Sequence, residues 1–394
     1  MPPSASLPVA LVTPVFPPDH GGLALAVARL TQQLQCRLPL DVIALKHTGS
    51  TPSVTVSTTT ASAVLRVEAS SWGEAHQQAF WLLRERGPYR CLHGIEPSLT
   101  GFPVALAARY ASVPYVLTSC GNDLQRDCFD PERQAALLFA LRHADAVVGA
   151  SRELCRLAGM LGATGRIQWI PDGVDNQQFR PLLPDETWLA ELSLKNAFPQ
   201  IGCIGETRQP QGLTLALRAF ALLRRQYPQA HLLVIRGSHT DASSVLSAFL
   251  ARHPQMRSAI HEFPWLPQER LVAYYNLLDV FWYPAINDGL PAVVLEALAC
   301  GRPVIASRRG GTADILTGSP LAPLMIPPGN PLALAEMTLR LLKMEPERRA
   351  YWAKAGREWV TTRFTPSAEA SAYLTLYDKL IALRHRRTLK NSDS

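Results

Sequence analysis

Short apolar segments alternate with helix-forming stretches in two separate series along this chain, and this pattern limits the fold more than any other feature. The first series of strand candidates covers 8–13, 40–45, 91–93, 115–118, 146–148 and 167–170. The second series covers 201–205, 231–235, 280–283, 303–306 and 324–326. Because buried strands separated by helices form parallel sheets with both faces covered, we predict an α/β fold with two doubly wound, Rossmann-like domains. Ligands of such sheets bind beyond the carboxyl ends of the strands, so we expect the two sheets to face a central cleft.

The expected domain boundaries follow from the length and from one change of pattern. At ~150 residues per domain, 394 residues correspond to two or three domains. The strand–helix alternation is interrupted by the proline-containing region 181–199. We therefore expect an N-terminal domain at 1–182, a linker at 183–199, a C-terminal domain at 200–364, and a final helix with a basic tail at 365–394 that packs back on the N-terminal domain. The low-complexity stretch 51–60 is predicted to be a loop.

Composition excludes several other classes of protein. Apolar residues make up 47% of the chain and charged residues 18%, which is typical of a chain that buries large cores. The seven cysteines form no CxxC pair, so they indicate neither a structural zinc site nor a disulfide framework. No apolar run approaches the ~18 residues of a membrane span, and the first residues lack the features of a secretory signal. We expect a cytoplasmic protein that does not bind nucleic acid.

The net charge of +7 is distributed unevenly along the chain. Residues 1–199 carry 16 basic and 17 acidic side chains, which leaves 39 − 16 = 23 basic and 32 − 17 = 15 acidic residues for 200–394. Part of this excess lies in the last helices and in the basic tail 384–390. The tail is either a solvated helix end or a weak attachment to the surface of an anionic membrane.

The segment from Asp288 to Ala306 contains the strongest chemical signal. Asp288 and Gly289 are expected in a loop, and Glu296 lies eight positions after Asp288 in the helix that follows. Two carboxylates and the amides at a helix start can hold the hydroxyl groups of one ligand. The alternative is a capped helix with Asp288 at its start and Glu296 in solvent.

Several stretches, in this order, resemble the retaining GT-B glycosyltransferases of family 4, also called glycosyl transferases group 1. These stretches are 18–22 (PDHGG), 144–151 (ADAVVGAS), 170–175 (IPDGVD), 205–208 with Gly212, 271–279 (LVAYYNLLD), the segment from Asp288 to Glu296, and 310–314 (GGTAD). The resemblance covers nearly the whole chain. It implies a nucleotide-sugar donor held mainly by the second domain and an acceptor held mainly by the first.

The resemblance also implies roles for individual residues. Glu296 would accept hydrogen bonds from the donor ribose, and Asp288 would hold hydroxyls of the transferred sugar with the amides of Gly289 and Leu290. In the first domain, Gly21 and Gly22 would allow a loop to approach the donor phosphates. The remaining candidates are Gly205 and Gly212 under the pyrophosphate, Cys120, Asn122 and Asp123 for the sugar or acceptor, and His93, which we expect at the end of a strand, pointing at the cleft. For His93 a structural role is an equal alternative.

Three positions depart from the family pattern. The family usually has an arginine and a lysine where this chain has Glu206 and Gln211, so Arg208 is the candidate for the missing phosphate-binding charge. Asp288 replaces the usual glutamate, and Cys120 replaces the usual histidine, which changes the hydrogen bonding expected near the sugar.

The expected reaction is the transfer of a sugar from a nucleotide diphosphate to a hydroxyl of a carbohydrate or lipid-linked acceptor, in polysaccharide or glycolipid assembly. The Asp-x-Asp motif of metal-dependent transferases does not occur, so we expect no metal or other cofactor. The resemblance implies retention of the anomeric configuration. A nucleotide-sugar epimerase on the same fold and a non-catalytic sugar-binding protein remain alternatives, and the sequence does not identify the donor or the acceptor.

Overall fold

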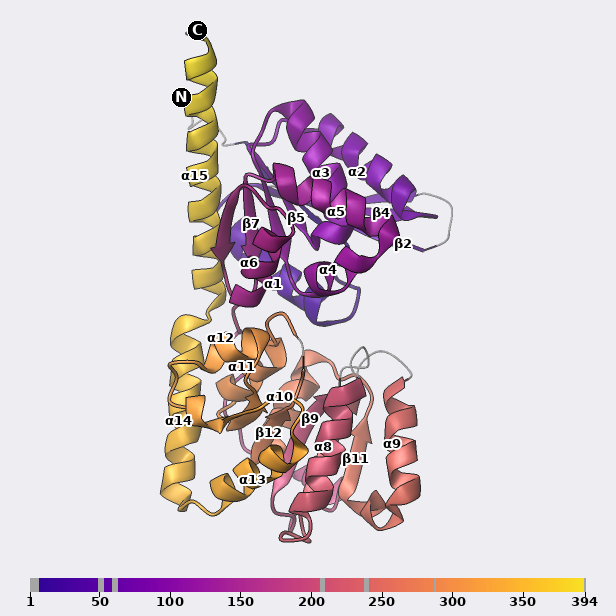
Figure 1. Ribbon diagram of the computed structural model, residues 1–394, viewed down its shortest axis with the longest axis vertical. Coiled ribbons are helices and arrows are strands. Elements are labelled where there is room, and N and C mark those ends of the chain that lie inside the picture. Colours follow the sequence, from indigo (N-terminus) through magenta and orange to yellow (C-terminus); the bar gives the residue numbers. More distant parts are fainter. Residues whose placement is uncertain are drawn as a thin grey trace. The chain divides into compact units, whose positions relative to one another are not determined.

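The computed structural model describes residues 7–48, 53–58, 63–205, 210–236, 241–286 and 288–392, and only the backbone at 58, 210–211, 241–244 and 387–392. The chain divides into two compact units (Figure 1). The first comprises Met1–Asp172 and Pro366–Ser394, and the second comprises Gly173–Thr365. Both are α/β units built around a parallel sheet, as the alternation of strands and helices predicts.

The first unit contains an eight-stranded sheet with the order β3-β4-β2-β1-β5-β6-β7-β8. All neighbouring pairs are parallel except β3 and β4, which are antiparallel. The strands are β1 (Val9–Thr13), β2 (Leu40–His47), β3 (Ser53–Thr58), β4 (Ala63–Ala69), β5 (Cys91–Ile95), β6 (Tyr115–Ser119), β7 (Ala146–Gly149) and β8 (Arg166–Trp169).

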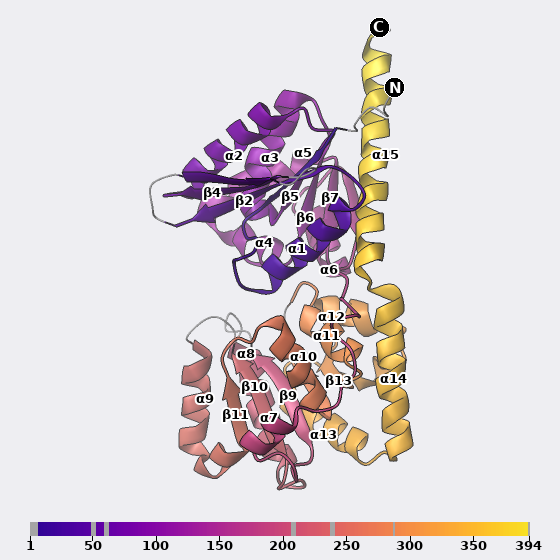
Figure 2. The ribbon, with the colours of Figure 1, turned by 180° about the vertical axis from the view of Figure 1, so that it is seen from behind.

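Helices cover both faces of this sheet. On one face lie α2, α3 and α5, and on the other lie α1 and α15, as the two opposite views in Figures 1 and 2 show. The helices of this unit are α1 (Gly22–Gln35), α2 (Trp72–Arg86), α3 (Pro97–Ala111), α4 (Asn122–Gln125), α5 (Pro131–His143), α6 (Arg152–Met160) and α15 (Pro366–Ser392).

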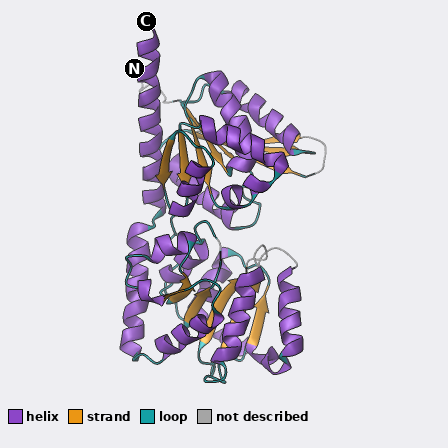
Figure 3. Cartoon of the chain, in the orientation of Figure 1, coloured by secondary structure: helices purple, strands orange, loops and turns teal. Residues whose placement is uncertain are grey.

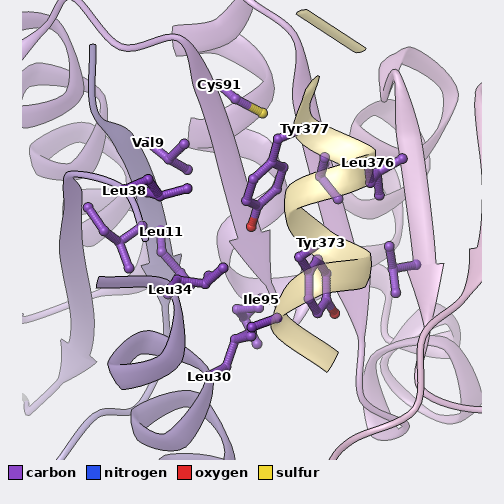
Figure 4. Close-up of a cluster of buried hydrophobic side chains, with 14 of the residues drawn as sticks. Val9, Leu11, Leu30, Leu34, Leu38, Cys91, Ile95, Tyr373, Leu376 and Tyr377 are labelled. Carbon is purple, nitrogen blue, oxygen red and sulfur yellow. The ribbon is translucent and has the colours of Figure 1, made fainter. Parts of the chain in front are cut away.

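The C-terminal helix α15 completes the core of the first unit. Its buried residues Ala370, Tyr373, Leu376, Tyr377 and Leu380 belong to one hydrophobic cluster with residues of β1 and α1 (Figure 4). Beside this cluster an ion pair joins Arg29 of α1 to Glu369 at 3.3 Å. Because burying each large apolar side chain contributes about 1.5–3 kcal/mol, the helix is an integral part of this unit.

One local expectation is corrected by the structure. Residues 53–58 form the edge strand β3 rather than part of a loop, and Val54 and Val56 pair with Val67 and Leu65 of β4. The alternation of β-branched residues in SVTVST is a signal that favours a strand. The tail at 384–390 lies in the last turns of α15, which continues to Ser392, in agreement with the alternative of a helix end.

The second unit contains a six-stranded, fully parallel sheet with the order β11-β10-β9-β12-β13-β14 and helices on both faces (Figure 3). Its strands are β9 (Gln200–Gly205), β10 (His231–Arg236), β11 (Ile260–Phe263), β12 (Val280–Tyr283), β13 (Val304–Ser307) and β14 (Met325–Ile326). Its helices are α7 (Glu186–Glu191), α8 (Pro210–Leu223), α9 (Asp241–Arg252), α10 (Gln268–Leu277), α11 (Ala292–Ala299), α12 (Gly310–Leu316), α13 (Pro331–Leu342) and α14 (Pro346–Arg363).

Residues 183–199, the expected linker, are structured and belong to the second unit. Trp188 of α7 is buried, stacks on Phe263 with ring centroids 5.4 Å apart, and lies under the Arg270 guanidinium at 4.7 Å. These contacts give the segment a hydrophobic anchor that its proline content does not reveal.

Candidate active site

The strand order of the second unit places a ligand site at one point of the sheet. From the central pair β9 and β12, the chain adds strands outward in opposite directions. Ligands of doubly wound sheets bind outside the carboxyl ends of the strands at such a reversal. Gly205 ends β9, and the connection from β12 to α11 carries Asp288.

Asp288 is held by the strand that precedes it. The hydroxyl of Tyr283, the last residue of β12, donates a hydrogen bond to Oδ2 of Asp288. Tyr283 is itself buried, whereas Asp288 is half-buried. The carboxylate is therefore oriented by a side chain that the sheet fixes, as a group that holds a sugar hydroxyl requires.

Glu296 lies on α11 and is oriented from a different helix. The hydroxyl of Tyr275 on α10 donates to Oε2 of Glu296 at 2.8 Å. Burial and the neighbouring Glu296 carboxylate raise the pKa of Tyr275 well above its usual value, so the phenol keeps its proton and acts as a donor. The alternative of a solvated Glu296 is wrong, because the side chain is half-buried and bonded to Tyr275.

Gly311 brings the start of α12 against the Asp288 loop. A Cβ atom added at Gly311 would lie 2.0 Å from the carbonyl oxygen of Gly289 and 2.6 Å from Cα of Leu290. Only glycine permits this approach. The packing fixes the backbone at Gly289 and Leu290, the two residues whose amides are expected to contact the transferred sugar.

The remaining donor-site predictions concern the connection from β9 to α8. Arg208 and Glu206 lie outside the described residues, as does the side chain of Gln211. Gly212 is in the first turn of α8, and a Cβ there would lie 3.9 Å from Cα of Ala285. This distance places α8 beside the loop that follows β12, so Gly205, Gly212 and Asp288 lie around the same edge of the sheet.

In the first unit, Gly21 and Gly22 form the start of α1. Gly21 is the N-cap residue with φ 120°, a conformation that favours glycine, and no side chain caps the helix. A Cβ at either glycine would meet no atom within 4 Å. The open space and the uncapped amides of a 14-residue helix are suited to an anion such as a phosphate.

Cys120, Asn122 and Asp123 follow β6 at the carboxyl edge of the first sheet. Asp123 is buried, and its Oδ1 accepts hydrogen bonds from Ser119 Oγ at 2.9 Å and from the Gly121 amide at 3.0 Å. Burial outweighs these bonds and raises the pKa of Asp123 to about 6. Burial and then the nearby carboxylates also raise the pKa of the Cys120 thiol, which therefore is no thiolate nucleophile. Asn122 is half-buried at the start of α4.

His93 does not end a strand and does not point out of the sheet, contrary to the expectation. It lies inside β5 with no exposed surface, its Nδ1 2.7 Å from Tyr377 Oη and its Nε2 2.7 Å from Thr118 Oγ1. Two partners, one of them on α15, occupy both ring nitrogens. The structure therefore favours the structural role, which the sequence left as an equal alternative.

The burial of His93 has a consequence for stability that can be measured. Burial lowers the pKa of His93 to about 3, while the unfolded chain takes up a proton near pH 6.5. The unfolded state therefore binds more protons below pH 6.5, and the free energy of unfolding should fall by about 2 kcal/mol between pH 7 and pH 5 on account of this group. Urea unfolding of the wild type and of His93→Asn at both pH values checks this contribution. The variant should lose less stability on acidification, and an unchanged pH dependence would contradict the assignment.

Among the residues that the structure describes, no three His, Cys, Asp or Glu side chains are grouped as metal ligands would be. No helix in the described ranges is both long and apolar enough to cross a membrane.

Comparison with solved structures supports the GT-B architecture. The structure matches the sucrose-phosphate synthase of Thermosynechococcus elongatus with a TM-score of 0.76 at 22% sequence identity. The match covers 96% of this chain and 100% of that chain. It includes both Rossmann-like units, so the predicted fold class is confirmed.

Comparison with sequences shows which enzymes the chain is similar to. Residues 198–344 match the family model described as glycosyl transferases group 1. The GDP-mannose-dependent alpha-(1-6)-phosphatidylinositol monomannoside mannosyltransferase of Mycolicibacterium smegmatis is 26% identical over 365 residues, 89% of this chain and 92% of that protein. The alpha-maltose-1-phosphate synthase of the same species is 24% identical over 410 residues, 95% of this chain and 100% of that protein. The chain is a glycosyltransferase with the GT-B fold, and its residues 198–344 match the group 1 family.

In this glycosyltransferase the sequence patterns revealed the carboxylates but not the groups that orient them. Tyr275 lies in the stretch 271–279, and Tyr283 ends a predicted strand. No sequence pattern links Tyr275 to Glu296 or Tyr283 to Asp288, so their hydrogen bonds could not be predicted. Gly311 lies in the quoted GGTAD segment, where its contact with Gly289 was not predicted.

Proposed function

We propose that this glycosyltransferase moves a hexose from a nucleotide-diphosphate sugar to an acceptor hydroxyl with retention of the anomeric configuration and without a metal ion. The observation that carries the proposal is the pair Asp288 and Glu296, each oriented by a tyrosine hydroxyl at the reversal point of the second sheet. Asp288 would hold sugar hydroxyls and Glu296 the ribose. Two oriented acceptors suit a ligand that carries several hydroxyl groups.

The reaction that we propose breaks the bond from the anomeric carbon to the diphosphate and forms a bond from the same face to the acceptor oxygen. The acceptor proton passes to an oxygen of the departing diphosphate, so charge and protons balance. Within the second unit, backbone amides at the start of α11 would stabilise the transferred sugar, because fixed dipoles aimed at developing charge lower the barrier. Within the first unit, the amides at the start of α1 would favour a phosphate group. Pro291, which precedes α11, contributes no amide.

For the donor we propose GDP-mannose as the first candidate, because the M. smegmatis relative that matches 89% of this chain is a GDP-mannose-dependent enzyme.

For the acceptor we propose a carbohydrate or lipid-linked alcohol in glycolipid or polysaccharide assembly at the cytoplasmic side of a membrane. The basic end of α15, where Arg386 is exposed, would attach weakly to anionic lipid. Co-sedimentation with phosphatidylglycerol vesicles should then be weaker for a chain that ends at residue 383, before the basic tail, than for the full chain.

A donor screen tests the proposed function directly. GDP-mannose, UDP-glucose and ADP-glucose are added separately to the full-length protein, and the shift in melting temperature is measured. We expect one of them to raise the melting temperature and to be consumed with release of its nucleoside diphosphate when an alcohol acceptor is supplied. Conversion to another nucleotide sugar without an acceptor would indicate an epimerase, and binding without turnover a sugar-binding protein. Absence of binding to all three would count against the proposal.

A further inference from the structure

The loop between β1 and α1 leads to Gly21 and Gly22 and contains Pro14, Pro17 and Pro18. Prolines have no amide to donate, so such a loop forms few backbone hydrogen bonds of its own. Within it, Asp19 Oδ2 accepts from the Phe16 amide at 3.2 Å, and the Asp19 amide donates to the Phe16 carbonyl at 3.1 Å. These bonds close one turn, and further support for the loop comes from a neighbouring strand.

Arg66 of β4 provides this support. Its guanidinium donates to the carbonyl oxygens of Phe16, at 3.3 Å, and of Pro17, and it lies over the Phe16 ring at 5.8 Å from the centroid. The reach across the sheet follows from the register, because Arg66 pairs with Ala44 of β2, and Ala44 pairs with Thr13 at the end of β1. The small Ala44 side chain leaves space for the long arginine to cross β2.

A second basic residue contacts the same loop from β2. Lys46 Nζ lies 2.8 Å from Asp19 Oδ1. Burial alone would raise the pKa of Asp19, but the hydrogen bonds from Lys46 and from the Phe16 amide outweigh it and lower the pKa. This pair makes a single charged hydrogen bond, and because Lys46 is exposed, solvent screens part of its contribution. Arg66, with two such bonds, is therefore the stronger of the two supports.

We propose that Arg66 is a positioning residue for glycosyl transfer: it holds the β1–α1 loop in the conformation that keeps Gly21, Gly22 and the first amides of α1 open to a phosphate group. The inference rests on the proposed function, since it assigns the loop to the donor phosphates. Arg66 itself touches the loop carbonyls and not the donor. Its loss should weaken contacts to phosphate and leave contacts to the nucleoside unchanged.

The test compares Arg66→Met with Arg84→Met, a matched arginine loss on α2 of the same unit, where Arg84 lies over the exposed rings of Trp81 and Tyr110. GDP and UDP are titrated by calorimetry, and guanosine and uridine are followed by ligand-observed NMR. We expect Arg66→Met to weaken binding of the diphosphate about tenfold to a hundredfold, with nucleoside binding unchanged and a melting temperature like that of the control. Arg66→Lys, which keeps the charge but not the fork geometry, should fall in between.

The other possible results distinguish failure of the proposed function from failure of the positioning role. If the wild type binds neither diphosphate nor nucleotide sugar, the proposed function fails. If the wild type binds GDP or UDP and Arg66→Met binds it equally well, the positioning role is overturned while the function stands. A loss of nucleoside binding, or a melting temperature well below that of Arg84→Met, would also overturn it, because a general structural role then explains the effect. As an independent check of the loop, Gly22→Ala should weaken diphosphate binding, and combining it with Arg66→Met should add little.

Discussion

Replacing Asp288 with alanine is expected to lower kcat/KM about a hundredfold or more, and replacing Glu296 with glutamine about tenfold to a hundredfold, with no change in folding. Each side chain is half-buried and accepts a hydrogen bond from a tyrosine, so its removal takes away a charged acceptor at the expected donor site. The two substitutions should affect different kinetic quantities. Loss of Glu296 should appear mainly as weaker nucleotide binding, and loss of Asp288 mainly as a lower kcat, because the transferred sugar is where the transition state develops.

Transfer kinetics with the donor identified by the screen measure both effects, and Glu336→Gln, a change at an exposed acid on α13, is the matched control. Tyr275→Phe and Tyr283→Phe should each lower activity less than loss of the carboxylate, since the acceptor remains but is less well oriented. Wild-type activity in both carboxylate variants would contradict the assignment of Asp288 and Glu296 to the active site. A fall in melting temperature beyond that of the control would show that the carboxylates serve the fold.

The second large effect is expected at Gly311. Replacing Gly311 with alanine would place a Cβ 2.0 Å from the Gly289 carbonyl oxygen, which is backbone and cannot move aside as a flexible side chain could. Either α12 or the Asp288 loop must shift, and we expect transfer activity to fall at least about a hundredfold, because displacements of about 1 Å at a reacting group have effects of this size. The variant should also be less stable by about 1–3 kcal/mol.

The matched control for Gly311 is Gly73→Ala in the first turn of α2, where a new Cβ would meet only Ser71 Oγ at 3.9 Å. That change should leave activity unaltered and stability equal or slightly higher, since alanine favours helix. Urea unfolding and transfer kinetics on both variants test the prediction. Normal activity in Gly311→Ala would mean that the backbone at Gly289 and Leu290 does not contribute to sugar binding.

Most elements of both sheets could be predicted from the sequence because a buried parallel strand leaves a local mark, a short run of apolar residues between helical stretches. The acid pair is also a local signal, because Asp288 in a loop and Glu296 in the helix that follows lie within nine residues of the sequence. Segment 53–58 carries two conflicting signals. Its low complexity indicates a loop, whereas its alternation of Ser or Thr with Val favours a strand, and the structure contains the strand.

The partners of these residues could not be predicted, because they come from distant parts of the chain. His93 meets Tyr377 of α15, Glu296 meets Tyr275 of α10, and Arg66 meets the carbonyls of Phe16 and Pro17 across two strands. Such contacts depend on sheet order, register and helix docking, and no short sequence pattern encodes these. Local sequence patterns were sufficient to predict two α/β units built on parallel strands and an acid pair in the second. The core position of His93, and the tyrosines, the glycine contact and the arginine around the site, follow from the packing of separate elements, because burial and hydrogen-bond geometry arise only when those elements meet.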